Sequence, residues 1–197
     1  MIRFLIAAAL AALLPLAAAA KVSLDEASRY LNSFRTAQGK FTQIADDGSI
    51  ATGSISIRRP GRVRFEYDPP LRQLVVAGAG QVLILDGKSN TGGEQYPLSQ
   101  TPLSIILADN VNLGRARMVT GHSSDGTKTT ITAQDPDNPG YGNIQLVFTE
   151  GPTQLRQWVV TDQNGSRTTV VLGDLATGVS LPASTFSLDR AKASFGG

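Results

Sequence analysis

Five arginines able to bind polar groups fall within a short stretch of the chain: Arg58, Arg59, Arg62, Arg64 and Arg72. An arginine carries fixed N–H donors and keeps its charge, so it suits the carbonyls at a helix end or a lipid head group. Arg62 and Arg64 share their alternation with Glu66, which places them on the water-facing side of a strand. Arg59 differs, because Pro60-Gly61 follows it at a strand end and lets it turn toward whatever covers the apolar face.

Residues able to catalyse a reaction are few. The one histidine, His122, approaches a turn, where such a residue is usually solvated, and the chain has no cysteine, so a zinc site lacks its usual ligands. The sequence has no nucleophile elbow and no Gly-rich loop that opens a helix. Asp135 and Asp137 could pair as acid and base, but their Pro-rich loop is more simply a solvated connection. We expect no enzyme activity, no metal and no cofactor.

The first twenty residues have the pattern of a secretory signal peptide. Arg3 supplies a positive start, residues 4–14 are apolar, and Ala18-Ala19-Ala20 offers small residues for cleavage. A membrane anchor is the alternative, but the apolar run is too short for one. Cleavage after Ala20 leaves residues 21–197 as a single domain of 177 residues, enough to bury a core. The 17 basic and 16 acidic residues of that domain do not favour nucleic-acid binding, and we expect a soluble monomer.

Two apolar helices are predicted. The first covers residues 23–36: Ser23 and Glu26 form a capping box, and Leu31 and Phe34 continue an apolar stripe at helical spacing. The second covers residues 101–107, with a Thr cap and Pro at the first helical position. In that helix Leu103, Ile106 and Leu107 share one side. Each helix can simply pack on a sheet, or it can cover something removable.

Alternating residues predict an antiparallel sheet. Val63, Phe65 and Tyr67 alternate with charged residues, and the apolar positions 144, 146 and 148 alternate with polar ones, so each strand buries one face. Asp-Gly or Asn-Gly pairs fit hairpin turns and recur at residues 47–48, 86–87, 125–126 and 164–165.

Two short runs are apolar on both faces and should lie beneath a covering layer. These runs are residues 74–76 and 82–85. Beyond Pro182 we expect one strand at residues 185–188 and then a loose polar tail.

Four stretches, taken in order, resemble the LolA family, the periplasmic carriers of outer-membrane lipoproteins. They are Phe41-Thr42-Gln43, the Arg-Pro hairpin and aromatic strand of residues 58–67, Thr101-Pro102, and residues 162–167 with Thr185-Phe186. The resemblance runs from about Leu24 to Leu188. Residues 189–197 do not resemble the C-terminal extension of the family.

This resemblance implies a mainly β fold, an unclosed antiparallel β-barrel or half-barrel covered by a helical lid. It also implies that the Arg of the Arg-Pro motif, here Arg59, bonds lid backbone and holds the cavity shut. The lid and lipid-cavity positions would be Leu31, Phe34, Val63, Phe65, Tyr67, Leu103 and Ile106. The partners would be outer-membrane lipoproteins through their acyl chains, an inner-membrane lipoprotein-releasing ABC transporter, and an outer-membrane acceptor where one exists.

Three other functions stay open at this point. The chain could carry free phospholipid or glycolipid, or it could be a binding module that senses lipids or lipoproteins. Such sensors usually carry a second domain, for which 177 residues leave no room. A periplasmic hydrolase would need a polar site in the hollow, whereas the residues expected to face inward are apolar.

Overall fold

The computed structural model describes residues 20–89 and 92–195. The predicted signal peptide therefore lies outside the described residues, except for Ala20. The described residues form one twelve-stranded antiparallel sheet. Its strands are β1 (Thr36–Ile44), β2 (Ile50–Arg58), β3 (Arg62–Tyr67), β4 (Gln73–Gly78), β5 (Gln81–Asp86), β6 (Glu94–Pro97), β7 (Val119–Ser124), β8 (Lys128–Gln134), β9 (Asn143–Glu150), β10 (Thr153–Thr161), β11 (Arg167–Leu172) and β12 (Ala176–Thr177).

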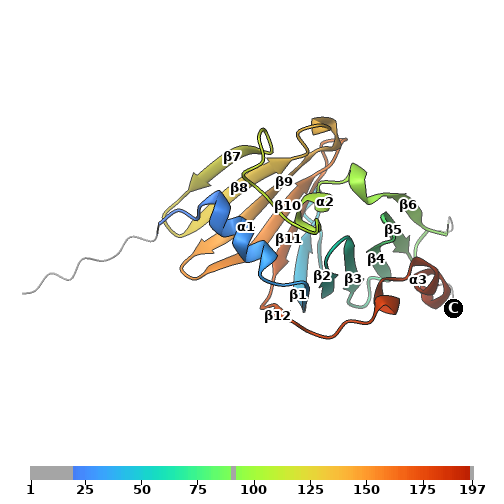
Figure 1. Ribbon diagram of the computed structural model, residues 1–197. Coiled ribbons are helices and arrows are strands. Elements are labelled where there is room, and N and C mark those ends of the chain that lie inside the picture. The colour runs from blue at the N-terminus through green and yellow to red at the C-terminus, as the bar shows by residue number, and fades with distance from the viewer. Residues whose placement is uncertain (1–19, 90–91, 196–197) are drawn as a thin grey trace, which may run out of the picture.

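The sheet is strongly curved but does not close. Its strand order is β6-β5-β4-β3-β2-β1-β11-β10-β9-β8-β7, with β12 paired to β1, so β6 and β7 are free edges. In Figure 1 the two wings of the sheet face each other across a hollow, with α1 and α2 on the hollow side and α3 outside. The predicted fold class, a half-barrel with helices over it, is confirmed.

The main core fills the inner face of the sheet. Val63, Phe65 and Tyr67 on β3 are buried, as are the three alternating apolar residues of β9. Because side chains alternate between faces along a strand, a buried inner face fixes the pairing register. The hairpin turns at residues 47–48, 125–126 and 164–165 are also confirmed, and each has its glycine at positive φ.

Helix α1 (Leu24–Asn32) is shorter than predicted. The Ser23 side chain caps it by accepting from the Glu26 backbone N–H at 3.1 Å. The Glu26 carboxylate, however, accepts a hydrogen bond from the Thr153 hydroxyl, which ties the helix to β10. The helix ends at Asn32 because the chain must turn into β1, so Phe34 lies in the connection and not on the helix.

The second predicted helix is also shorter. A 3-10 turn, η1 (Leu98–Gln100), precedes α2 (Leu103–Ile106), a single turn with Pro102 at its N-cap. The Thr101 hydroxyl donates back to the Leu98 carbonyl at 3.0 Å, so it does not cap α2 as we predicted.

The prediction for the C-terminal tail is wrong. The predicted strand at residues 185–188 is replaced by a 3-10 helix, η3 (Ala183–Phe186), followed by α3 (Leu188–Phe195). These two elements pack on the outer face of β4 and β5 and bury Phe186 and Ala191 against the outward apolar residues of those strands. The tail is thus the covering layer that the two fully apolar strands required.

A charge placed beneath α3 should detach it. Ala191 is 1% exposed, and burying an unpaired carboxylate there costs on the order of 3 kcal/mol. We expect Ala191→Asp to lower the free energy of unfolding by about that amount in a urea titration. Ala193, two residues on, is exposed, so Ala193→Asp serves as the control and should change the free energy of unfolding by less than about 0.5 kcal/mol. Equal effects of the two changes would mean that α3 does not cover the sheet in solution.

Candidate functional site

A small closed cavity lies beneath α1 and α2 on the inner face of the sheet. Its lining is apolar except for one arginine, and consists of Leu31, Phe34, Ile57, Arg59, Ile106, Leu107, Leu155, Trp158, Leu172 and Leu175. The cavity volume is about 20 Å³, which is room for one water molecule and far too little for an acyl chain. Anything larger can enter only if the covering segments move.

Aromatic rings pack against one another in the rest of the hollow. Phe41 packs edge-on against Phe65 and Tyr67, with ring centroids 5.3 and 5.1 Å apart. Gly53 makes room for this packing, because a Cβ there would lie 2.7 Å from the Phe41 ring. Phe65 in turn meets Trp158 of β10 at 6.3 Å, although three strands separate β3 from β10 in the sheet. The two wings of the sheet therefore touch across the hollow.

Arg59 lies where the β2–β3 turn meets both parts of the cover. Its guanidinium donates to the Asn32 side-chain oxygen at 3.3 and 3.4 Å and to the Phe34 carbonyl at 3.2 Å. Two residues along the same turn, the Gly61 N–H donates to the carbonyl of Leu107, just after α2, at 2.8 Å. One turn of the sheet thus holds the end of α1 and the end of α2.

The Arg59 side chain is buried at some energetic cost. The residue is only 5% exposed, and its Nε has no partner among the described residues. Burial lowers the pKa of the Arg59 guanidinium, and the positive charge of Arg35 acts in the same direction. The Phe34 ring, 5.8 Å from the guanidinium carbon, offers a cation–π contact in partial compensation. A buried cation held by a few long hydrogen bonds can be released more easily than one in a close ion pair.

The residues predicted for the lid and cavity fall into two groups. Leu31, Phe34, Ile106 and Arg59 line the cavity. The others face the same hollow without lining the cavity: Val63, Phe65 and Tyr67 are buried in the core, and Leu103 is half-buried against it. Burial raises the pKa of Tyr67 to about 12, so its hydroxyl stays neutral and donates to the Gln43 side chain at 2.6 Å.

Several lining residues were missed in the sequence. Leu155 and Trp158 both face inward although they are three residues apart, because a β-bulge shifts the register of β10 between Leu155 and Gln157. A bulge breaks the period of two and leaves no pattern to find. Trp158 is the only tryptophan of the chain, a signal that could have been used. Leu175 lines the cavity from the loop that connects β11 to β12.

His122 has a structural position. It is half-buried, not fully solvated as expected, and its Nε2 lies 2.9 Å from the Val22 carbonyl. The Val22 N–H donates to the Thr129 hydroxyl at 2.9 Å, so the segment before α1 is fixed to β7 and β8.

Asp137 pairs with Arg115 at 2.6 Å in an exposed loop. Within residues 20–89 and 92–195 no group of three or more acidic or histidine side chains could hold a metal ion.

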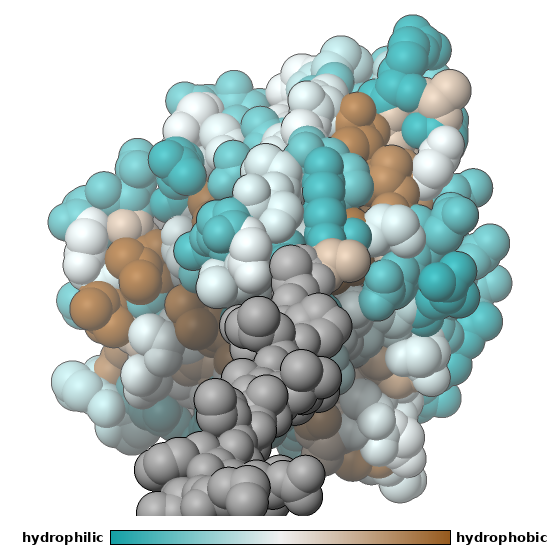
Figure 2. All heavy atoms as spheres, turned by 90° about the vertical axis from the view of Figure 1, so that its left-hand side faces the viewer, coloured by the Kyte–Doolittle hydropathy of each residue, from teal (hydrophilic) through white to brown (hydrophobic). Residues whose placement is uncertain are grey.

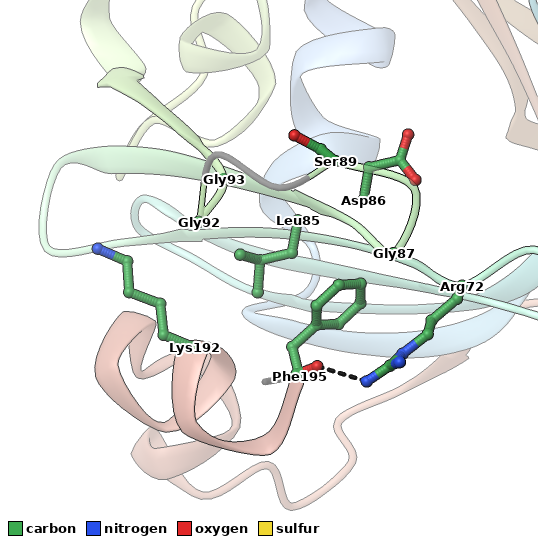
Figure 3. A pocket seen from close by; sticks show the side chains of 9 residues that line it. All are labelled: Arg72, Leu85, Asp86, Gly87, Ser89, Gly92, Gly93, Lys192 and Phe195. Atoms are coloured by element: carbon green, nitrogen blue, oxygen red, sulfur yellow. Dashed lines mark hydrogen bonds between the residues drawn. The ribbon is translucent and has the colours of Figure 1, made fainter. Parts of the chain in front are cut away.

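A larger, open pocket lies on the opposite side of the sheet, between α3 and the end of β5 (Figure 3). Its polar groups already have partners: Arg72 donates to the Phe195 carbonyl at 2.6 Å and stacks on the Phe195 ring, and Lys192 donates to Gln95 at 3.1 Å. This pocket is open and lined partly by charged side chains, so it lacks the closed apolar lining that a lipid chain requires.

The face of the molecule shown in Figure 2 is mostly hydrophilic. Figure 2 views the molecule from the side on which the chain enters the fold, and hydrophobic side chains there form separate groups among hydrophilic ones. Among the described residues the large apolar side chains that are exposed are Ile44, Ile50 and Val171. None of the described helices has the length and hydropathy needed to cross a membrane.

Comparisons with known proteins agree on one family. A family model described as "Outer membrane lipoprotein carrier protein LolA" matches residues 32–189. An outer-membrane lipoprotein carrier protein of Coxiella burnetii is 28% identical over 137 residues, covering 67% of this chain and 60% of that protein. One from Azotobacter vinelandii is 25% identical over 192 residues, covering 93% of this chain and 92% of its own.

The fold is also found among solved structures. One of them is a putative outer membrane lipoprotein-sorting protein domain from Vibrio parahaemolyticus, with a TM-score of 0.50 and 10% identity. The similarity covers 87% of this chain and 98% of the domain. At this identity the comparison establishes the fold alone.

Proposed function

Because this chain belongs to the LolA family, whose model matches most of its length, we propose that it carries lipoprotein acyl chains in the cavity beneath α1 and α2. The chain would be exported by its first twenty residues, take its cargo from an inner-membrane ABC transporter, and pass it to an outer-membrane acceptor. Residues 21–197 would form the single carrier domain. The observation that carries this proposal is the apolar cavity roofed by short segments, with Arg59 as the one charged group in its lining.

The energetics of acyl chains suit such a carrier. Each buried CH₂ group gains about 0.8 kcal/mol, so roughly 14 groups give on the order of 11 kcal/mol relative to water. This prevents loss of cargo into the periplasm. Delivery then exchanges one apolar environment for another, with a small net change in free energy. A few hydrogen bonds of about 1 kcal/mol each can set the direction of that exchange.

The carrier must open to load. The closed cavity has room for no more than one water molecule, so cargo competes with the contacts that α1 and α2 make with the sheet. These contacts are regained when cargo leaves. Closure of the empty carrier therefore supplies free energy for release, and the residues that hold the lid shut tune the affinity for cargo.

The single tryptophan gives a direct test. Trp158 lines the cavity and is 2% exposed, so an acyl chain in the cavity would contact it. We expect a long-chain fatty acid brominated near its middle to quench most of the Trp158 fluorescence in a saturable titration. A brominated four-carbon acid at the same bromine concentration is the control and should quench little. Equal, non-saturating quenching by both acids would contradict the proposed cavity.

The natural cargo can be identified by mass spectrometry of protein purified gently from its own periplasm. Bound triacylated lipoprotein is the expected result. Free phospholipid or glycolipid alone would make the chain a carrier of free lipid. Fatty acid released from added lipid in proportion to the amount of protein would instead favour a hydrolase.

A further inference from the structure

The two parts of the lid are joined to each other as well as to the sheet. Residues 109–113 continue from α2 and run beside α1. Ser28, on α1, accepts from the Leu113 N–H at 3.0 Å. Arg35, after α1, donates to the Asp109 carbonyl at 2.7 Å and pairs with its carboxylate.

The central link is the side-chain amide of Asn32, the last residue of α1. Its Nδ2 donates to the Val111 carbonyl at 2.8 Å, and its Oδ1 accepts from the Val111 N–H at 3.0 Å. The amide thus satisfies both backbone groups of one residue, as a neighbouring strand would. Val111 is 2% exposed, and buried backbone groups left without partners cost free energy, so this pairing fixes how α1 and residues 109–113 lie together.

The same Asn32 oxygen also accepts hydrogen bonds from both terminal nitrogens of Arg59. Three parts of the molecule therefore meet at one side chain: α1, residues 109–113 and the β2–β3 turn. Among the described residues no hydrogen bond joins the Arg59 guanidinium directly to residues 109–113, where only the charge of Asp109 acts on it, and its remaining hydrogen bond goes to Phe34. Its influence on that half of the lid can pass through the Asn32 amide.

We infer that Asn32 is a positioning residue that couples the two halves of the lid, so that α1 and α2 with residues 109–113 open and close together under the control of Arg59. The inference rests on the proposed function for the role of the lid, but the coupling itself exists without cargo. Replacing Asn32 by alanine should let each half of the lid move separately. Hydrogen exchange in residues 109–113 should then no longer respond to a substitution at Arg59.

A double-mutant cycle tests this coupling by hydrogen exchange in the empty protein. The reporter is the Leu113 N–H, which bonds to the Ser28 hydroxyl of α1 and, within the described part of the chain, has no bond to Asn32 or to the β2–β3 turn. We expect Arg59→Leu to speed exchange of this N–H by about tenfold in the otherwise unchanged protein. In the Asn32→Ala background the same change should have less than about a twofold effect, because coupled sites are not additive.

Two further variants separate coupling from simple loss of structure. Asn32→Asp keeps the oxygen that accepts from the Val111 N–H and from Arg59 but loses the donor to the Val111 carbonyl, so it should restore the response of Leu113 to Arg59→Leu in part. Ser33→Ala removes only a hydrogen bond to the Tyr30 carbonyl and should leave the response unchanged. If the effects of Asn32→Ala and Arg59→Leu simply multiply, or if Asn32→Asp restores none of the response, the inference is wrong.

The fluorescence titration with brominated acids keeps this inference apart from the proposed function. If the exchange experiment shows coupling but the brominated acid does not quench saturably, only the carrier proposal is rejected. If the acid quenches saturably but the effects of the two substitutions on the exchange rate multiply, only the role of Asn32 is rejected.

Discussion

Arg59→Leu should leave the protein folded but slow the transfer of cargo to its acceptor by about tenfold. The guanidinium makes three hydrogen bonds of 3.2 to 3.4 Å to Asn32 and Phe34, which together contribute ~3 kcal/mol net. Desolvation of the unpartnered Nε offsets part of this, which leaves on the order of 1.4 kcal/mol, or a factor of ten. Leucine loses the bonds, so closure of the empty carrier drives release less strongly.

Stability and transfer should respond differently to this change. Replacing a buried charge by an apolar side chain regains part of the stability that the lost hydrogen bonds supplied, so we expect the protein to stay folded with a urea midpoint close to the natural one. The measurement is transfer of labelled lipoprotein to acceptor vesicles, alongside urea unfolding. Arg62→Leu, which alters a residue on the outer side of β3, is the control and should transfer normally. Normal transfer by Arg59→Leu would show that the hydrogen bonds of Arg59 do not set the release of cargo.

Arg59→Lys sharpens the interpretation. Lysine keeps the charge but lacks the planar fork that reaches Asn32 and Phe34 at the same time. If the geometry of the hydrogen bonds matters, this variant should transfer more slowly than the natural protein. If charge alone matters, it should transfer at the natural rate.

The sequence contained enough to predict the sheet, since strands with one buried face must alternate. Val63, Phe65 and Tyr67 were placed correctly on that ground alone. The tail was mispredicted although its pattern was present: Leu188, Ala191 and Phe195 recur at helical spacing, and the apolar outer faces of β4 and β5 needed a cover. Each observation alone was weak, but together they predict α3.

The cavity lining could be predicted only in part. Leu31, Phe34 and Ile106 follow from apolar stripes on predicted helices, and Arg59 from its place before Pro60. Leu155 and Trp158 depend on a bulge in β10, a local feature of strand pairing that leaves no periodic trace in the sequence. Asn32 gave no signal at all, because its importance comes from Val111, a residue 79 positions away in the chain.

The second large effect concerns Trp158, which occupies the space that cargo must enter. Trp158→Ala should lower the free energy of unfolding by about 3 to 5 kcal/mol, because truncation of a buried aromatic residue leaves a void. The void adjoins the cavity, so an acyl chain can occupy it without displacing the ring that meets Phe65. We therefore expect a saturated long-chain fatty acid to bind the variant more tightly than the natural protein in calorimetry.

Phe148→Ala provides the matched control for this prediction. Phe148 is as fully buried as Trp158 but packs against Tyr30 and does not line the cavity, so its truncation should cost similar stability without improving binding. Fatty acid at 100 times its dissociation constant would stabilise a binding-competent variant by about 2.7 kcal/mol. At one fixed fatty-acid concentration, the rise in melting temperature should therefore be larger for Trp158→Ala than for Phe148→Ala. Equal rises for both variants would place the acyl chain elsewhere in the hollow, since only the void left by Trp158 opens onto the cavity beneath α1 and α2.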